Sequence, residues 1–533
     1  MRAMMSTFTL LLAASVLPAS LLPTGPAVAM TLKIARAGDA LSLDPHAQNE
    51  GPTHNLNHQI YEPLVRRHHD GSLVPTLAVS WGITADPRIW EIRLRGGVTF
   101  HDGTPFTADD AVYSIKRAMS PTSDMKGGLT SIEEVVKVDD LTIRLRTKGP
   151  NPLLIQIFTN VFMMSKAWAE RNKAEAPQNF AAREETFAVR NAMGTGAYAL
   201  VSREPDVRTV LRRHEGYWGK GSVPLEASEV VFTVIKAAPT RVAALLSGEV
   251  DIVQDMPVQD IARVASTPGL RVDIGAENRS IFFGLNVGEA ELKSSDIKGR
   301  NPLADVRVRR AMSMAIDRTA IKKVVMADQS APSGTIVPPF TRGHTAELAA
   351  IPRRDIAKAK ELMAAAGYGA GFSLKLHCTN DRYLNDEKIC QAAVGMLGQI
   401  GIKAALDARS KSIHFPQLQK REVDFYMIGW GVPTYDSEYM LSYLVHTQTG
   451  QLGGWNATGY SNPAIDAKIR SLGEEIDIAK RDQTIAEIWR ELHEAQIYIP
   501  VHNQVNAWGM KAALDAKVHP DNTIWIKDLS LSK

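Results

Sequence analysis

The sequence predicts a mixed α/β protein with more than one domain. Alternating apolar and basic residues, typical of half-buried strands, occur at 90–100 and 141–147, and apolar residues at helical spacing occur at 478–495. Strand and helix patterns alternate along the chain, which is typical of α/β domains. The 533 residues are 44% hydrophobic and 22% charged, a globular composition with room for about three domains.

Local patterns place the individual elements, with more strand early and more helix late. Thr107 and Asp110 have the spacing of a capping box at the start of a helix, and Asp305 is predicted to cap another helix. Gly367 suits the position after a helix end. The predicted strands are 90–100, 141–147, 230–236, 280–287, 374–378, 402–408 and 424–430. The main predicted helices are 109–119, 306–316, 354–367, 386–401, 463–471 and 478–495.

The charge balance argues against a nucleic-acid partner. The chain has 61 basic and 58 acidic residues and a formal net charge of +3, whereas nucleic-acid binding requires a clear basic excess. Basic residues cluster at Arg307, Arg309 and Arg310, and we interpret this cluster as a solvated helix face.

Residues 1–29 have the pattern of a secretory signal peptide. Arg2 supplies the basic start, residues 8–22 are apolar, and residues 27–29 (Ala-Val-Ala) resemble a cleavage site. The apolar segment is too short to span a bilayer comfortably, although a retained membrane anchor is the alternative. No cysteine lies directly after this segment, where a lipid anchor would be attached, so we expect a soluble protein outside the cytoplasm without a lipid anchor.

The chain has two cysteines, Cys378 and Cys390. In an oxidising compartment two cysteines twelve positions apart are expected to form a disulfide. Cys378 ends a predicted strand and Cys390 lies in the next predicted helix, so the bond would join neighbouring elements. A thiolate nucleophile or a metal-binding pair is the alternative, but the chain has no CxxC spacing.

Common catalytic motifs are absent from the sequence. It contains no GxSxG, HExxH or GxxxxGK[ST] motif. Gly194 and Gly196 lack the third glycine of a dinucleotide site and are predicted to mark a chain crossing between domains. His54 and His58 have the spacing of metal ligands on a helix, but fourteen histidines make such a pair common by chance. We therefore expect a binding protein with no cofactor and no resident metal, and not an enzyme.

The most specific motif lies in residues 90–118, where residues 100–110 are FHDGTPFTADD. Residues 60–81 (IYEPLVRRHHDGSLVPTLAVSW) and 303–321 (LADVRVRRAMSMAIDRTAI) are two further motifs. All three resemble the extracytoplasmic solute-binding proteins of peptide and nickel ABC transporters, the bacterial family 5 binding proteins. Shorter motifs follow the order of that family at 194–198, 248–253 and 497–509.

The resemblance implies a large periplasmic-binding-protein fold of type II, with three α/β domains in two lobes around a ligand cleft. A discontinuous domain I would comprise residues 30–65, 195–280 and 500–533. Domain II would be 66–194, and domain III would be 281–499. The lobes are expected to close over the ligand by a hinge motion.

The resemblance also implies the function. We expect a monomeric periplasmic receptor that captures a short peptide or peptide-like solute and delivers it to an ABC permease at the inner membrane. A nickel or metallophore receptor is the alternative within the family. A secreted hydrolase is the alternative outside the family. The sequence does not distinguish the receptor from a chaperone-like or sensory binding protein that works without a permease.

The resemblance indicates where the ligand ends are held. In peptide-binding members an Asp just after a Gly-Trp pair binds the ligand's ammonium group, but that position is Pro433 here, and Asp436 is the possible substitute. Arg382 matches, within one residue, an Arg that holds the ligand carboxylate, and a guanidinium suits that role. The candidate ligand-binding residues are Arg382, Tyr383, Trp430, Tyr435, Asp436, His446, Trp455 and Asn456.

Overall fold

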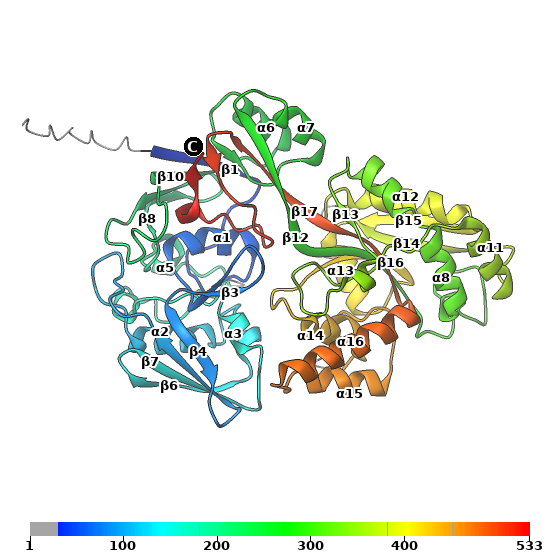
Figure 1. Cartoon of the computed structure of the whole chain (residues 1–533), viewed down its shortest axis with the longest axis horizontal. Helices are drawn as coiled ribbons and strands as arrows, with labels where there is room; N and C mark the ends of the chain where they lie inside the picture. Colours follow the sequence, from blue (N-terminus) through cyan, green and yellow to red (C-terminus); the bar gives the residue numbers. More distant parts are fainter. Residues whose placement is uncertain (1–29, 181, 381, 450–451, 533) are drawn as a thin grey trace, which may run out of the picture.

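The computed structural model describes residues 30–180, 182–380, 382–449 and 452–532. The predicted signal peptide lies outside the described residues. The chain forms two lobes that are joined by two long strands, β12 (Leu270–Leu285) and β17 (Tyr498–Lys511) (Figure 1). We call residues 30–276 with 505–532 the first lobe, and residues 280–503 the second lobe.

One large sheet runs through both lobes. Within the described residues it has 11 strands in the order β15-β14-β16-β12-β17-β11-β1-β10-β9-β8, and β13 also pairs with β17. The remaining strands of this sheet are β1 (Met30–Arg36), β8 (Tyr198–Glu204), β9 (Arg208–Arg213), β10 (Ala227–Val234), β11 (Ile252–Val253), β13 (Ala331–Pro332), β14 (Phe372–Thr379), β15 (Ile402–Arg409) and β16 (Phe425–Gly431).

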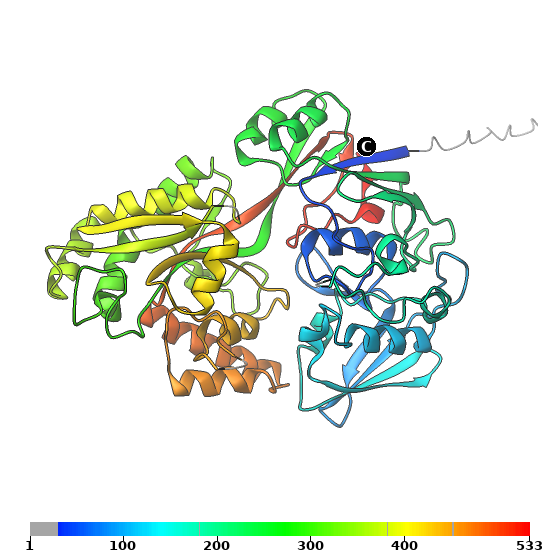
Figure 2. The same cartoon turned by 180° about the vertical axis from the view of Figure 1, so that it is seen from behind.

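The register between β12 and β17 breaks where the chain passes from one lobe to the other. Ala276 pairs with Val505, and the next pair is Ser280 with Asn503. The segment 277–279 therefore bulges opposite a single residue, and bulges of this kind bend and twist a strand pair. The view from behind shows the same two strands running from one lobe to the other (Figure 2). We call residues 277–279 the hinge segment.

The first lobe contains a second, antiparallel sheet in the order β4-β5-β7-β6. Its strands are β4 (Ala78–Ile83), β5 (Ile89–Leu94), β6 (Ile132–Asp139) and β7 (Thr142–Thr147), and α2 (Ala108–Ala118) packs beside them. The predicted capping box is present, because the Thr107 and Asp110 side chains exchange hydrogen bonds with each other's backbone. The predicted strand 90–100 is wrong at its end: β5 stops at Leu94, and Gly97 takes a positive φ of 76° in the turn that follows.

The FHDGTPFTADD motif packs against the glycines at 194 and 196. The His101 backbone N–H donates to Gly194 O at 3.0 Å, and His101 Nε2 lies 3.0 Å from Gly196 O. A Cβ on Gly196 would lie 2.5 Å from Gln59 O, at the end of α1 (Gly51–Ile60). Only glycine allows this approach, so the motif stabilises the fold of the first lobe.

The second lobe follows the sequence prediction closely. Its main helices are α8 (Val306–Ala315), α11 (Ile356–Ala365), α12 (Asp386–Gly398), α15 (Pro463–Leu472) and α16 (Ile478–Ala495). Asp305 caps α8 by accepting a hydrogen bond from Arg307 N. A disulfide joins Cys378 of β14 to Cys390 of α12, as predicted from the compartment. These elements share one apolar core, whereas the first lobe has two separate apolar clusters. The division into three domains stays a prediction.

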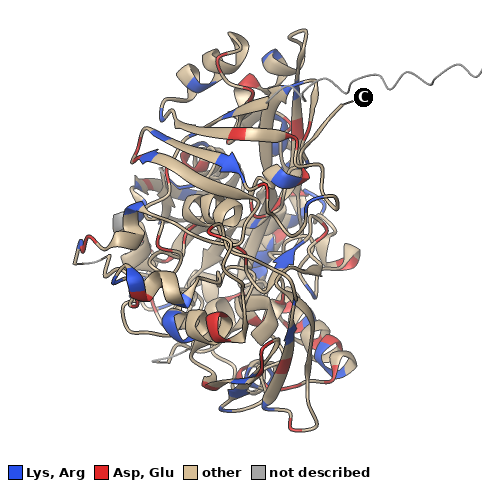
Figure 3. Ribbon diagram, turned by 90° about the vertical axis from the view of Figure 1, so that its left-hand side faces the viewer, with Lys and Arg blue, Asp and Glu red and all other residues tan. Residues whose placement is uncertain are grey.

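Basic and acidic residues are intermingled along the ribbon seen from the side (Figure 3). Across the part of the chain that the structure describes, no helix is both long enough and apolar enough to cross a membrane.

Candidate ligand-binding cleft

A cavity of about 920 Å³ lies between the lobes, beside the hinge segment. Its walls come from distant parts of the sequence, which meet only because β12 and β17 hold the lobes side by side. The first lobe contributes Arg36, Gly38, Glu50, Gly51, Pro52, Asn55, Gln254, Asp255, Asp521 and Asn522. The hinge segment and the second lobe contribute Glu277, Arg279, Arg382, Lys411, Phe415, Pro416, Gln419 and Trp455.

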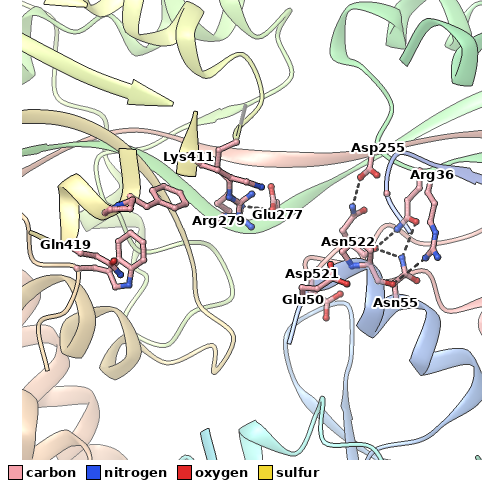
Figure 4. A pocket seen from close by; sticks show the side chains of 18 residues that line it. Arg36, Glu50, Asn55, Asp255, Glu277, Arg279, Lys411, Gln419, Asp521 and Asn522 are labelled. Carbon is pink, nitrogen blue, oxygen red and sulfur yellow. Dashed lines mark hydrogen bonds and ion pairs between the residues drawn. The ribbon is translucent and has the colours of Figure 1, made fainter. Parts of the chain in front are cut away.

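The two walls of this cavity carry opposite charge. The first-lobe wall carries three acids, Glu50, Asp255 and Asp521, and one base, Arg36. Arg36 pairs with Asp39 at 2.8 Å. The facing wall carries the bases Arg279, Arg382 and Lys411 and one acid, Glu277. Figure 4 shows Arg279 and Lys411 on one side and Glu50, Asp255 and Asp521 on the other. The cavity is therefore polarised across the gap between the lobes.

An adjoining cavity of about 400 Å³ has an aromatic wall. Trp430, at the end of β16, lies 5.6 Å from Trp455 between ring centroids, and Trp455 lies 5.3 Å from Phe415 in an edge-to-face arrangement. Tyr439 completes this wall, with its ring 6.1 Å from that of Trp430. Such rings offer flat apolar surfaces to a ligand. Trp430 and Trp455 are separate candidates in the sequence prediction, and the structure brings their rings together.

Arg382 and Tyr383 also line the 400 Å³ cavity. Arg382 is exposed, and its guanidinium carbon lies 5.2 Å from the centre of the Tyr383 ring. Tyr383 is buried, and its hydroxyl donates to Gly429 O at 3.0 Å, which fixes the ring against β16. Arg279 lies near the same ring at 5.9 Å. The candidates Arg382, Tyr383, Trp430 and Trp455 thus line the same cavity.

Tyr435 and Asp436 lie apart from these four, in a different cavity of about 930 Å³ between the lobes. The Asp436 carboxylate is 2.8 Å from Arg481, and both side chains are only 3% exposed. It also accepts a hydrogen bond from Glu438 N and so caps α14 (Ser437–Met440). Asp436 therefore stabilises the second lobe, and its carboxylate is already occupied by protein groups.

Tyr435 belongs to a contact between the lobes. The Arg67 guanidinium, from the first lobe, lies 3.9 Å from the centre of the Tyr435 ring. Arg67 also donates to Pro433 O of the second lobe at 3.2 Å and to Gly71 O of its own lobe at 3.0 Å. Arg67 thus fastens the two lobes to each other beside the cleft.

His446 and Asn456 are buried away from the cleft. The Asn456 amide donates to the backbone oxygens of Val445, His446 and Tyr460, and so holds the loop in shape. His446 Nε2 lies 2.9 Å from an Arg470 nitrogen, and its Nδ1 lies 2.7 Å from Thr447 O. Both side chains are thus bonded to other protein groups: Asn456 to backbone oxygens, and His446 to Thr447 O and to Arg470 of α15.

His54 and His58 lie on α1, as expected from their spacing, but they point to different partners. His54 Nε2 is 2.8 Å from Asn49 Oδ1, and His58 Nε2 is 3.0 Å from Asn160 Oδ1. Burial lowers the pKa of His54 to about 4 and that of His58 to about 3. Within the described ranges, no group of three or more His, Cys, Asp or Glu side chains is arranged to hold a metal ion.

Sequence reasoning missed several residues that line the cleft. Arg279 and Glu277 lie in the hinge segment, Lys411 and Phe415 lie on α13 (Lys411–Gln419), and Asp521 lies in a turn near the C-terminus. None carries a local pattern that marks a ligand contact. Only the strand pairing of β12 and β17 brings these segments to one place, so no sequence signal pointed to them.

The fold and the cleft are those of a two-lobed solute-binding protein. The profile described as "Bacterial extracellular solute-binding proteins, family 5 Middle" matches residues 72–451. The chain belongs to this family.

Curated relatives match nearly the whole chain. It is 24% identical to the periplasmic murein peptide-binding protein MppA of Escherichia coli K12, over 91% of this chain and 90% of MppA. It is 24% identical to the glutathione-binding protein GsiB of Pectobacterium atrosepticum, over 94% of each chain. Among solved structures, the unliganded open form of MppA superposes with a TM-score of 0.77 at 23% identity, covering 95% of this chain and 98% of MppA. This similarity supports the fold described above.

Proposed function

We propose that this protein is the periplasmic receptor of an ABC importer for a short peptide or peptide-like solute. The receptor captures the solute between its lobes, closes by bending at the hinge segment, and presents the solute unchanged to the inner-membrane permease. It carries out no covalent chemistry. The family match and the peptide- and glutathione-binding relatives support this class of ligand.

The observation that carries the proposal is the polarised cavity of about 920 Å³ between the lobes. Its volume lies within the roughly 300–1,000 Å³ of small-ligand sites. Charged groups taken from water need charged or polar partners, and this cavity offers acids on one wall and bases on the other. A solute with both signs of charge matches it better than an apolar or singly charged solute.

Within the cleft we assign two roles to the second lobe. Arg382 binds an anionic group of the solute, because a planar guanidinium pairs with a carboxylate through two hydrogen bonds. The aromatic wall of Trp430, Trp455 and Phe415 receives an apolar part of the solute. The aromatic wall can accept side chains of different shape, which suits a receptor for several related peptides.

The receptor is proposed to act as a soluble monomer in the periplasm, after removal of residues 1–29. The relative MppA, which is named periplasmic, and the pattern of the first 29 residues support this location.

Isothermal titration with di- to pentapeptides, free and blocked at either end, tests the proposal. We expect micromolar or tighter binding by at least one group of free peptides, together with a smaller radius of gyration in solution scattering as the lobes close. R382A should weaken binding of peptides with a free carboxylate. The control K388A, which replaces an exposed lysine on α12 outside the cavity, should leave binding unchanged. No binding by any peptide of the panel would refute the peptide assignment.

A further inference from the structure

Two acidic side chains line the aromatic cavity of about 400 Å³: Glu277 and Asp521. Both Glu277 oxygens are used by the protein, because they accept from Arg279 Nε at 2.7 Å and from Gln504 Nε2 at 2.8 Å. Asp521 differs. Among the described residues its carboxylate is held within its own turn, by Thr523 N, which donates to Oδ1 at 3.0 Å, by the Thr523 side chain and by the His519 ring.

The turn that carries Asp521 is firmly attached to the first lobe. Asn522 N donates to His519 O at 2.9 Å, and the Asn522 side chain bonds to Asp255 at 2.7 Å and to Trp508 at 2.8 Å. Pro520 O accepts from the backbone N–H of Asn278 in the hinge segment at 2.9 Å. A carboxylate held this way loses little conformational freedom when it binds a ligand.

The surroundings of Asp521 favour its charged form. Burial works to raise its pKa, but the attraction and hydrogen bond of His519 and the backbone and side-chain hydrogen bonds of Thr523 outweigh burial, so the pKa lies below its usual range. The side chain remains 38% exposed to solvent. Closure of the lobes would remove the water that surrounds it. A charge pair formed there on closure gains strength as water is excluded.

The other residues that line the cavity determine which chemical groups surround Asp521. The backbone wall of Gly429, Gly431 and Pro433 brings no charge, and the Trp430 and Trp455 rings bring aromatic faces. A carboxylate beside aromatic faces is a favourable site for an ammonium or guanidinium group, through ion pairing and cation–π attraction. The cationic residues of the same cavity, Arg279 and Arg382, come from the hinge segment and the second lobe.

We propose that Asp521 binds a cationic group of the solute from the first lobe, while Arg382 binds its anionic group from the second. This inference rests on the proposed function and adds the orientation of the ligand and the residue that selects for a free amine. The ligand then bridges the lobes through its two charges. Solutes that lack either charge leave one wall of the cavity without a partner and bind weakly.

D521N tests this assignment, because asparagine keeps the shape and the Oδ1 acceptor for Thr523 N but removes the charge. D515N is the matched control: Asp515 pairs with Arg271 outside the cavity, and the change in net charge is the same. Trialanine, N-acetyl-trialanine and the tightest free peptide of the panel are titrated into wild type, D521N and D515N. In parallel, solutes that co-purify with wild type and D521N are released by denaturation and identified by mass spectrometry.

We expect D521N to weaken binding of the free peptides by about 10- to 100-fold, the range of a charged hydrogen bond. N-acetyl-trialanine should bind weakly and equally to wild type and D521N, and D515N should match wild type throughout. Equal loss for free and acetylated peptides, or no loss at all, overturns the inference while the proposed function stands. A changed scattering curve of ligand-free D521N with unchanged affinity also overturns it, because Asp521 would then join the lobes directly.

Failure of the peptide function gives a different result. If no peptide binds, but wild type carries a solute with a basic nitrogen that D521N lacks, the inference stands and the peptide assignment falls. If the solute has no cationic group, or if neither titration nor extraction finds any ligand, both are overturned.

Discussion

Replacing Asp436 by asparagine is expected to destabilise the second lobe without weakening ligand binding. The Asp436–Arg481 pair is 2.8 Å apart and only 3% exposed on each side. After D436N, the Arg481 guanidinium keeps its hydrogen bond to Leu472 O but loses its buried counter-charge. Breaking a buried pair on one side costs about 3–5 kcal/mol, because an uncompensated charge stays buried. D436N should therefore lower the free energy of unfolding by about that amount.

Urea unfolding of the ligand-free protein measures this loss. The midpoint should fall in D436N with little change in slope, which reports stability rather than altered exposure of surface. The double variant D436N/R481M should be less destabilised than the sum of the two single changes by about 0.5–3 kcal/mol, the usual coupling of residues in contact. A D436N protein with the wild-type midpoint but weaker peptide binding would refute the reasoning and return Asp436 to the ligand site.

Three further predictions concern the disulfide, the contact between the lobes and buried histidines. C378A/C390A, or reduction of the wild type, should cost about 3 kcal/mol of stability for this short loop; equal urea midpoints with and without reductant would contradict this. R67A should raise the radius of gyration of the ligand-free protein, because Arg67 fastens the lobes together, whereas R66A, which removes an ion pair within the first lobe, should not; identical scattering curves would count against the contact. Because burial lowers the pKa of His58, the unfolded state binds more protons, so stability falls as pH falls below about 6.5, by about 2 kcal/mol for this residue between pH 7 and 5. H58Q should flatten that pH dependence of the urea midpoint, and an unchanged slope would show that His58 does not contribute.

Interactions between residues close along the chain were enough to predict most of the helices and strands and the disulfide. Capping at Thr107 and Asp305 depends on residues two or three positions apart, and the pattern of 478–495 gives α16 with the same bounds. The pairing of Cys378 with Cys390 needed only the compartment and the absence of other cysteines. The prediction for 90–100 failed beyond Leu94, because the turn with positive φ at Gly97 took precedence over the alternating pattern.

The candidate ligand-binding residues were likewise predicted only in part from the sequence. Family resemblance pointed to Arg382, Tyr383 and Trp430, and the Gly-rich surroundings of Trp455 pointed to that residue. All four line one cavity. For Asp436, His446 and Asn456 the residue type was visible in the sequence but the partner was not: Arg481, Arg470 and backbone oxygens already bind these side chains.

Sequence alone determined the strands, helices, caps and disulfide of this protein, because each depends on neighbours close along the chain. Only the tertiary structure decided which wall of the cleft carries acids and which carries bases. That arrangement arises from the pairing of β12 with β17, which brings the turn at Asp521 beside the hinge segment and across the cavity from Arg382. Contacts between such distant segments leave no periodic or local pattern in the sequence, so they become visible only when the chain is folded.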